Sequence, residues 1–524
     1  MNRGESWRIA GASLSLANLL TIGRWDVIQD VGFHYYRKLP DAWFLLRETL
    51  FSIFLCGVAI LILGLAARRW QGRIPGKCGL FLLLGLLVIA ADVVAGRSGR
   101  LGAYVFQWAW PIAMAGALLA AIAAFFLEAR AWKVLQGALL FALPVLPVSV
   151  LWTGWLIVSF GGSSALADRA PAPLLTGKHA NAPRVLWIVF DEFDYEIAFG
   201  HPPPELRLPE LQRLRQTSLF AEQASSVGRR TEESIPGYFA GRRVEYSKPL
   251  GPANLMLRFE GTKAMVPWTN YSSVFSAARQ LGFNSSVTGF FHPYCRVLPD
   301  LASCYWLPGS HAVDDTAEFR EQPARRWEAT VRQLFPHSQI LRWLGVIDDS
   351  SQARDDAERG RMIFLFQSLL SRSLRAAVNP SHQLVYVHLP APHPPGYFDV
   401  GKNDFSRSAS ATYVDNLALV DRTVGQFRHA LEKAEKWDAT TVLITTDHAL
   451  RPGKGRGPRV GFRPASDAPS KHVPFIVKLA GQTTGIDFAE PFNTVLTREL
   501  TLAILRGDIG DERALAAWIS SHRH

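Results

Sequence analysis

Hydrophobic residues concentrate in the first third of the 524-residue chain, where they form long stretches with few charges. Four stretches could each cross a bilayer core of roughly 30 Å, namely 48–67, 78–96, 104–127 and 134–160. A shorter stretch, 8–23, carries Ser, Asn and Thr and is a first span, a re-entrant piece or a signal-peptide core. We favour an uncleaved first span, because no A-x-A cleavage site follows it. The pattern predicts a transmembrane domain of about five helices over residues 1–160.

The distribution of Lys and Arg indicates an orientation only weakly. With five spans and the N-terminus inside, the cytoplasmic segments hold slightly more of these residues than the outer loops do. An odd number of spans then leaves everything after residue 160 outside. We therefore predict a multi-pass protein of the cytoplasmic (inner) membrane, with the rest of the chain on the outer, periplasmic side.

The pattern changes after residues 161–183, which are rich in Gly, Ser, Ala and Pro and which we interpret as a linker. Continuous apolar runs at 185–190, 384–387 and 441–446 are typical of buried parallel strands. Residues 409–436 space their apolar positions by three and four, which predicts an amphipathic helix between two of these strands.

Strands and helices that alternate in this way predict an α/β fold, with a mainly parallel sheet between two layers of helices. We place this domain at residues 184–524. Within it, residues 316–378 look helical and charged, as expected for an insertion or a lid. The fold class is thus a multi-span helical membrane domain followed by a three-layer α/β domain.

The net charge indicates which partners the protein could bind, and the cysteines bear on the redox state of its compartment. The formal net charge of +11 is spread over loops and no nucleic-acid motif is present, so we expect anionic lipid headgroups as partners and no nucleic acid. Of the four cysteines, Cys295 and Cys304 lie nine positions apart in the second part of the chain. In an oxidising compartment they would form a disulfide, and the alternative is two separate buried thiols.

Residues with ligand or nucleophile chemistry border several of the apolar runs. Asp191 follows the first run, and Asp447 with His448 follows the third, where an open α/β sheet presents its ligands. Thr231 begins the turn Thr-Glu-Glu-Ser-Ile-Pro-Gly, in which Ser234 competes with it for a nucleophile role. Carboxylates, an imidazole and a hydroxyl together indicate a divalent-metal site built around a hydroxyl nucleophile.

Three more histidines are candidates for the same chemistry. His388 and His393 share the sequence His-Leu-Pro-Ala-Pro-His, and His472 lies in Lys-His-Val-Pro-Phe. Histidines around such a site would contact substrate oxygens, protonate a leaving group or bind a second metal. We expect all three to take part in catalysis.

A further set is expected to bind an anionic substrate. His292 lies in Thr-Gly-Phe-Phe-His, and Arg229 and Arg230 directly precede Thr231. Arginines in this place would neutralise a phosphate, although flanking arginines are usually just solvated.

In their order along the chain, these motifs resemble the alkaline phosphatase superfamily. They look most like its membrane-anchored branch, which contains lipoteichoic acid synthase and the lipid A phosphoethanolamine transferases. Val-Leu-Trp-Ile-Val-Phe-Asp-Glu is similar to the first strand with its metal-binding acid. Thr-Glu-Glu-Ser-Ile-Pro-Gly-Tyr-Phe-Ala-Gly-Arg is similar to the nucleophile helix, and Thr-Thr-Asp-His to the later metal pair.

The resemblance implies a ligand set. Asp191, Asp447 and His448 would hold one divalent metal, zinc or manganese, with Thr231 as the fourth ligand and the nucleophile. Whether a second metal binds stays open, because the transferases usually read Gly-Glu-Ser after the Asp-His pair and this chain reads Ala-Leu-Arg-Pro. The formylglycine cysteine of ordinary sulfatases is missing.

The resemblance also implies a function for the outer domain. We expect transfer of a phosphoryl-linked headgroup from a phospholipid or other anionic lipid donor to an envelope glycan or lipid acceptor, through a covalent intermediate on Thr231. The first alternative is a membrane-anchored phosphodiesterase, phosphatase or sulfatase-like hydrolase that uses water as the acceptor. The second is a non-catalytic envelope assembly protein that keeps the fold without the metal.

Overall fold

The computed structural model describes residues 3–30, 32–38, 43–96, 122, 125–160, 166–176, 183–312, 351–451 and 471–523. This described part of the chain divides into two compact units. The first unit takes the residues up to His34 and those from Trp43 to Leu166. The second unit takes the short segment Tyr35–Lys38 together with the residues after Leu166.

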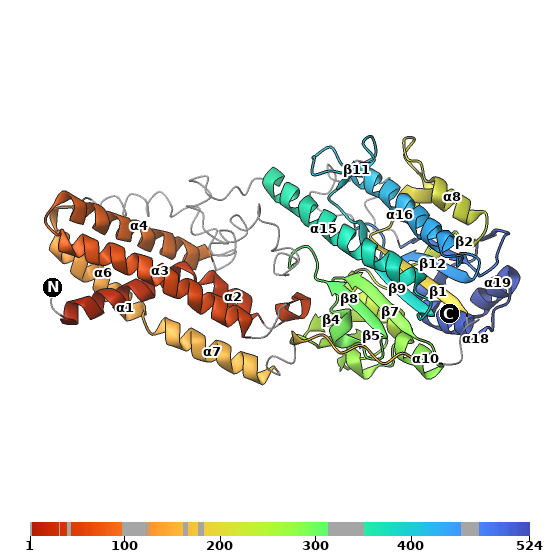
Figure 1. The fold of residues 1–524 in the computed structure, drawn as a ribbon, viewed down its shortest axis with the longest axis horizontal. Helices are drawn as coiled ribbons and strands as arrows, with labels where there is room; N and C mark the ends of the chain where they lie inside the picture. Colours follow the sequence, from red (N-terminus) through yellow and green to blue (C-terminus); the bar gives the residue numbers. More distant parts are fainter. Residues whose placement is uncertain are drawn as a thin grey trace. The chain divides into compact units, whose positions relative to one another are not determined.

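The first unit is helical and is built around a core of apolar side chains. Its helices are α1 (Arg3–Leu20), α2 (Gly23–Gln29), α3 (Phe44–Arg69), α4 (Ile74–Gly96), α6 (Glu128–Ala142) and α7 (Val145–Ser159). Helices α1, α3, α4 and α6 lie side by side (Figure 1). Pro144 separates α6 from α7, because proline lacks the N–H that a helix interior needs.

Among the described helices, three segments are long and apolar enough to cross a membrane: Phe44–Arg69, Ile74–Val94 and Glu128–Ser159. They correspond to the expected spans 48–67, 78–96 and 134–160. The stretch 8–23 forms α1, which is not one of the three, and the expected span 104–127 lies almost wholly outside the described residues. These segments indicate membrane association, whereas five spans and the orientation stay predictions.

The second unit contains, among its described residues, an eight-stranded sheet in the order β14-β2-β13-β12-β1-β9-β7-β8. The strands that carry the site are β1 (Arg184–Asp191), β9 (Leu384–Pro392), β7 (Ser285–Phe290) and β12 (Thr440–Thr446), and these four are mutually parallel. The others are β2 (Leu219–Ala221), β8 (Ser303–Leu307), β13 (Phe475–Lys478) and β14 (Ile486–Phe488), of which β13 runs antiparallel to its neighbours. The predicted mainly parallel sheet is confirmed.

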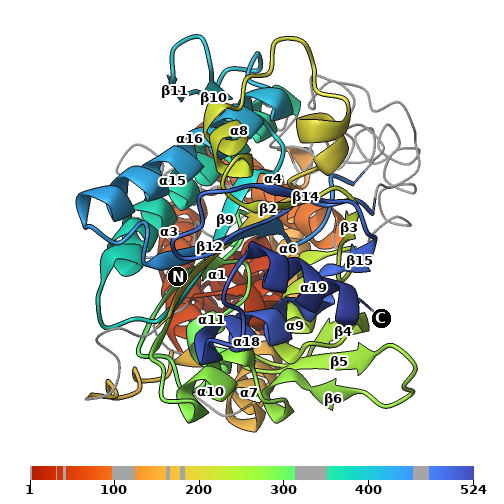
Figure 2. The same ribbon diagram turned by 90° about the vertical axis from the view of Figure 1, so that its right-hand side faces the viewer.

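Helices cover both faces of this sheet, because alternate side chains of the buried strands feed two cores. In β1, Val185, Trp187 and Val189 belong to one core, whereas Leu186, Ile188 and Phe190 belong to the other. The first core includes side chains of α9 (Thr231–Ala240), α10 (Val274–Gln280), α18 (Thr497–Arg506) and α19 (Glu512–Ser521). The second includes side chains of α8 (Pro209–Arg215), α15 (Ser351–Val378) and α16 (Tyr413–Lys433). Figure 2 shows the two helix layers on opposite sides of the strands.

Helix α16 is the amphipathic helix expected at 409–436, and a capping box begins it. Thr412 Oγ1 accepts a hydrogen bond from Asp415 N, and Asp415 Oδ2 accepts one from Thr412 N, so both free donors at the helix start are satisfied. Helix α15 confirms the helical expectation for residues 351–378, and residues 316–350 lie outside the described part.

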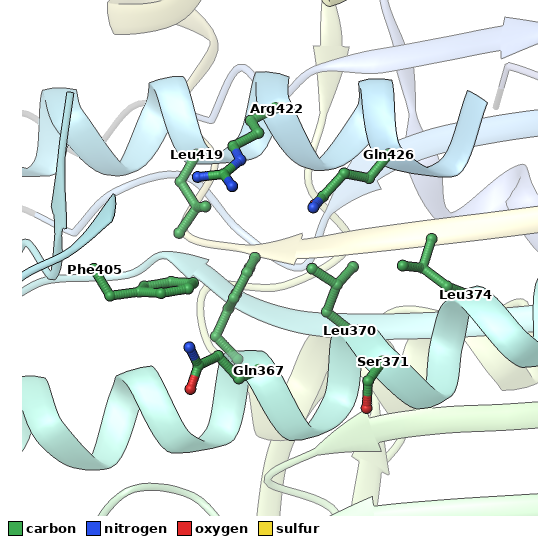
Figure 3. A pocket seen from close by; sticks show the side chains of 9 residues that line it. Gln367, Leu370, Ser371, Leu374, Phe405, Leu419, Arg422 and Gln426 are labelled. Atoms are coloured by element: carbon green, nitrogen blue, oxygen red, sulfur yellow. The ribbon is translucent and has the colours of Figure 1, made fainter. Parts of the chain in front are cut away.

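A pocket of about 290 Å³ opens between α15 and α16 (Figure 3). Leu370 and Leu374 of α15 face Leu419 of α16 across it, with Arg422 and Gln426 beside them. None of the residues that line it is a candidate of the sequence analysis. The pocket therefore belongs to the packing of this helix layer.

A disulfide joins Cys295 to Cys304, as the sequence predicted. Cys295 lies in the short helix α11 (Tyr294–Val297) and Cys304 in β8. The bond therefore ties the segment that follows β7 to the edge strand of the sheet. A separate three-stranded sheet, β4-β5-β6 (Val244–Pro249, Leu255–Phe259 and Val266–Pro267), completes the regular structure around this region.

Candidate functional site

Asp191, Asp447 and His448 meet at the carboxyl ends of two neighbouring strands. Asp191 is the last residue of β1 and Asp447 directly follows β12. The two strands are parallel, with Phe190 opposite Thr446, so the residues that follow them emerge together. One potential ligand atom from each of the three residues lies within 4.8 Å of the other two, and all three residues are buried.

This group has the properties expected of a divalent-metal site. In the described part of the chain, Asp191 Oδ1 and His448 Nε2 are buried without a hydrogen-bond partner. Buried carboxylates without a compensating cation are costly, because they lose their hydration and gain nothing in return. Two carboxylates and one imidazole fit a divalent cation.

The two carboxyl groups differ in their electrostatic surroundings. Burial raises the pKa of Asp191 well above its usual value, and the charges of Asp447 and Glu192 raise it further. Burial would also raise the pKa of Asp447, but His448, His388 and a hydrogen bond from Thr231 hold it below its usual value. Without a metal, Asp191 is therefore the carboxyl group that takes up a proton first as pH falls, and Asp447 is the one that stays ionised.

Thr231 is the first residue of α9, and its hydroxyl is directed at this group. Thr231 Oγ1 donates a hydrogen bond of 2.7 Å to Asp447 Oδ2. The start of a ten-residue helix also offers backbone N–H groups that favour an anion. Ser234, the competing hydroxyl, is fully buried and its Oγ has no partner among the described residues. The geometry thus favours Thr231 over Ser234 as the nucleophile.

Glu192 is a buried acid beside the metal group, and Arg451 is the residue that neutralises it. Arg451 Nε lies 3.1 Å from Glu192 Oε1, and the Glu192 side chain is fully buried. Glu192 adopts a φ of 60°, a left-handed conformation that is rare for a residue with a side chain. Its backbone N–H donates to Asp447 Oδ1 at 3.1 Å, which holds this conformation.

Arg451 was not among the candidates from the sequence. The sequence did contain a signal that could have identified it. After the Asp-His pair the chain reads Ala-Leu-Arg-Pro, where the transferases usually read Gly-Glu-Ser. The guanidinium places a positive charge near Glu192, Asp191 and Asp447, and these carboxylates raise its own pKa against the effect of burial.

His388 lies within β9 and is fully buried near the metal group. Its Nδ1 shares a hydrogen bond of 2.9 Å with the Tyr294 hydroxyl, and its Nε2 has no partner among the described residues. Burial lowers the pKa of His388 to about 4, so the ring is neutral at neutral pH. It can therefore offer Nε2 to a substrate oxygen without carrying a charge.

His292 was expected to bind substrate, but both of its ring nitrogens are engaged within the protein. Nδ1 lies 2.9 Å from the Tyr35 hydroxyl, and Nε2 lies 3.1 Å from the Thr231 carbonyl oxygen. The ring is fully buried, which leaves no nitrogen for a substrate. In this structure His292 holds the backbone of the candidate nucleophile instead.

The remaining candidates lie closer to solvent. His393 Nε2 is 3.9 Å from Glu192 Oε1, at the edge of the buried group. His472 is 47% exposed in its side chain, and its Nδ1 lies 3.1 Å from Glu196 Oε1. That hydrogen bond lowers the pKa of Glu196. Arg229 and Arg230 are exposed just before α9. Their catalytic and substrate-binding roles stay predictions.

Comparisons with known proteins show to which family the chain belongs. Residues 183–487, more than half of the chain, match the family model described as Sulfatase. No curated protein matches the chain. The matched region contains Asp191, Thr231, Asp447 and His448.

Several solved structures are similar at low sequence identity. Ps i-CgsB is 15% identical with a TM-score of 0.41, and the match covers 62% of this chain and 72% of that one. The phosphonate monoester hydrolase of Agrobacterium radiobacter is 15% identical with a TM-score of 0.37, covering 62% and 74%. A protein in the alkaline phosphatase superfamily from Vibrio parahaemolyticus is 14% identical with a TM-score of 0.37, covering 65% and 72%. On the match to the family model, the chain belongs to the sulfatase family and is a sulfatase-like enzyme of the alkaline phosphatase superfamily.

Proposed function

We propose that this enzyme moves a phosphoryl-linked headgroup from a phospholipid donor to an envelope glycan or lipid acceptor, with a divalent metal as cofactor. The observation that carries the proposal is the hydrogen bond of 2.7 Å from Thr231 Oγ1 to Asp447 Oδ2. It directs an alcohol toward the buried group of two carboxylates and one imidazole. An alcohol needs such a site, because its pKa is too high for attack on a phosphodiester at neutral pH.

Asp191, Asp447 and His448 would hold the cation, zinc or manganese, with Thr231 Oγ1 as the fourth ligand. When bound, such a cation supplies positive charge that stabilises an alkoxide and polarises a phosphoryl oxygen. Asp447 Oδ2 already accepts the Thr231 hydroxyl, so the attacking oxygen is oriented before substrate arrives. Arg451 would balance Glu192 in the place where a second cation would otherwise be needed.

The first half-reaction forms a bond between Thr231 Oγ and phosphorus and breaks the bond between phosphorus and the oxygen of the lipid glycerol. His388 Nε2, which has no partner among the described residues, would donate a hydrogen bond to a phosphoryl oxygen. The proton of the Thr231 hydroxyl would pass to Asp447 Oδ2, which already accepts its hydrogen bond. The leaving alkoxide would take a proton from His393 or His472, which lie closer to solvent.

The second half-reaction reverses these roles. The acceptor hydroxyl attacks phosphorus and gives its proton to the histidine that lost one. The bond from phosphorus to Thr231 Oγ breaks, and Thr231 Oγ regains its proton from Asp447 Oδ2. Water in place of the acceptor would give a hydrolase with the same first step. The residues of the first half-reaction therefore serve both outcomes.

Two features support a lipid donor. Three described segments are long and apolar enough to cross a membrane, which would keep the enzyme beside a substrate that cannot easily leave the bilayer. Apolar side chains such as Phe54, Ile62 and Phe141 point outward from the first unit, as expected for helices in contact with lipid. The threonine at the nucleophile position argues against sulfate-ester hydrolysis that depends on formylglycine.

The decisive experiment follows the headgroup. Full-length protein in lipid nanodiscs is given a divalent metal and phospholipids that are isotopically labelled in the headgroup and its phosphate. Mass spectrometry of the trapped protein should locate the label on the peptide that contains Thr231. Label that passes on to an added glycan or lipid acceptor supports the transferase, and label released as free headgroup phosphate supports a hydrolase. No label on the protein and no product would contradict both.

Thr231→Ala should reduce turnover to below a hundredth of the wild-type rate, because each ~1.4 kcal/mol of lost barrier stabilisation is tenfold and a covalent step contributes several such units. Ser234→Ala is the matched control, since it removes a hydroxyl from the same helix. The control should retain turnover, and the opposite result would move the nucleophile to Ser234.

A further inference from the structure

A four-residue segment of the second unit comes from far outside the region that matches the family model. Tyr35–Lys38 lies in the sequence between α2 and α3, yet it belongs to the second unit. Tyr35 is fully buried in one of the cores of that unit. The segment is also held through its neighbours, because Arg296 Nη2 donates to Arg37 O at 2.9 Å and Lys38 Nζ donates to Trp306 O at 3.0 Å.

Tyr35 is linked to the candidate nucleophile through one histidine. The Tyr35 hydroxyl lies 2.9 Å from His292 Nδ1, and His292 Nε2 lies 3.1 Å from the backbone oxygen of Thr231. Aromatic rings pack around the imidazole, with the Trp268 and Phe291 centroids each 5.3 Å from it. The ring is therefore held by aromatic packing and by two hydrogen bonds at its nitrogens.

The direction of both hydrogen bonds can be assigned. A carbonyl oxygen only accepts, so His292 Nε2 must carry the hydrogen. The ring is fully buried, and its two hydrogen-bond partners are a hydroxyl and a carbonyl, neither of which is a carboxylate. Burial without a counter-charge favours the neutral ring, so Nδ1 has no hydrogen. The Tyr35 hydroxyl must then be the donor to Nδ1, and burial, which raises the pKa of Tyr35, keeps that proton in place.

We propose that Tyr35 is a positioning residue for the nucleophile: its hydroxyl fixes the tautomer of His292, and His292 thereby holds the carbonyl of Thr231 at the start of α9. The opposite tautomer would set the Nε2 lone pair against the carbonyl oxygen and repel it. Holding this carbonyl keeps Thr231 Oγ1 within 2.7 Å of Asp447 Oδ2. The inference rests on the proposed function, because it takes Thr231 as the attacking residue.

A sequence comparison limited to the α/β domain cannot identify Tyr35. Tyr35 lies outside residues 183–487, and no motif surrounds it. In the sequence it is one of several aromatic residues between two apolar helices. Only the fold separates it from Tyr36, whose ring contacts Phe291 and His311.

The test compares Tyr35→Phe with Tyr36→Phe in the full-length, metal-loaded protein. Each variant loses one hydroxyl from the same segment. We expect Tyr35→Phe to lower kcat about tenfold or more with KM changed less than twofold, because the hydroxyl acts on the geometry of attack and not on substrate binding. Tyr36→Phe should keep both values near wild type. Equal losses in the two variants would mean that the segment only packs, and would overturn the proposal.

A double-mutant cycle with His292→Gln shows whether Tyr35 acts through His292. A glutamine can still donate to the Thr231 carbonyl but has no tautomer for Tyr35 to set. In the His292→Gln background, Tyr35→Phe should therefore have little further effect on kcat. If Tyr35→Phe lowered kcat by the same factor in the His292→Gln background as in wild type, the proposal would be contradicted. This holds even if the single variants also lose some stability.

A spectroscopic readout separates this inference from the proposed function. In protein labelled with 15N-histidine, the signal that disappears in His292→Gln identifies His292, and its two nitrogens report which one carries hydrogen. Wild type should show hydrogen on Nε2 alone, and Tyr35→Phe should lose this single state. An unchanged tautomer in Tyr35→Phe overturns the inference, whereas full activity in Thr231→Ala overturns the proposed function and leaves the tautomer result standing.

Discussion

Thr231 and Asp447 are 216 positions apart in the sequence, yet their side chains share a hydrogen bond of 2.7 Å. Such contacts between single residues determine which side chains are ionised and which oxygen can attack a substrate. Asp447 stays ionised more readily in the metal-free group because His448 lies beside it and because Thr231 Oγ1 and the Glu192 N–H donate hydrogen bonds to it. Asp191 lacks this support and has a raised pKa instead.

The raised pKa of Asp191 predicts that metal binding releases a proton. The cation needs the carboxylate, whereas burial makes Asp191 bind a proton more readily in the metal-free protein. Apparent metal affinity should therefore rise as pH rises through the raised pKa and level off above it. Calorimetric titration of the chelator-treated protein, in two buffers of different ionisation enthalpy, measures the protons released. Heat that does not depend on the buffer at any pH from 5 to 8 would contradict the assignment.

Arg451 should stabilise the fold through Glu192. Removing the guanidinium leaves a buried carboxylate with less compensation, so Arg451→Met should lower the free energy of unfolding by about 1–2 kcal/mol, a value reduced from that of a buried pair because Arg451 is 41% exposed. Thermal melting of Arg451→Met and of the double variant with Glu192→Gln measures the effect. The double variant should regain most of the loss, and a loss that persists would show that Arg451 acts elsewhere.

At the scale of elements, the site depends on neighbouring parallel strands. The ends of β1 and β12 are adjacent, and His388 of β9 lies on the other side of β1. Helix α9 brings Thr231 to these strand ends and stops at Gly241, whose φ of 65° suits a left-handed cap. The candidate site residues come together because the ends of these elements lie next to one another.

The disulfide should stabilise the segment that carries His292 and Tyr294. It closes a short loop, so replacing Cys295 and Cys304 by Ser should lower the free energy of unfolding by on the order of 2–3 kcal/mol. Non-reducing digestion with mass spectrometry identifies the bond in the purified protein, and thermal melting of the double variant gives the loss. Two thiols that alkylate freely in the wild type would contradict the bond.

At the scale of the whole molecule, the chain combines a helical unit that has membrane-spanning candidates with a sulfatase-like unit. The side of the membrane on which the second unit lies remains a prediction from the Lys and Arg distribution. The disulfide agrees with an oxidising compartment.

An exposed position of the second unit tests this placement. In a chain whose Cys56 and Cys78 are replaced by Ser, Ser408→Cys offers a thiol in an exposed loop. A membrane-impermeant maleimide should label this variant in spheroplasts without permeabilisation. Labelling only after permeabilisation would place the unit in the cytoplasm. A cysteine at Phe366, which is fully buried, serves as the negative control.

Local patterns in the sequence predicted several strands, one helix and the three residues that meet in the candidate metal group. The apolar runs 185–190, 384–387 and 441–446 became β1, β9 and β12, and 409–436 became α16, because these periodicities depend only on local geometry. Asp191, Asp447 and His448 could be identified because a residue at a parallel strand end has a predictable position.

The partners of the polar side chains became visible only in the folded protein. The fold placed His292, an expected substrate ligand, in a hydrogen bond with the Thr231 carbonyl oxygen, and it paired Arg451 with Glu192. It also brought Tyr35 into the second unit from a place between two apolar helices. Hydrogen bonds and ion pairs act over a few ångströms between residues that can be hundreds of positions apart, so no local pattern records them.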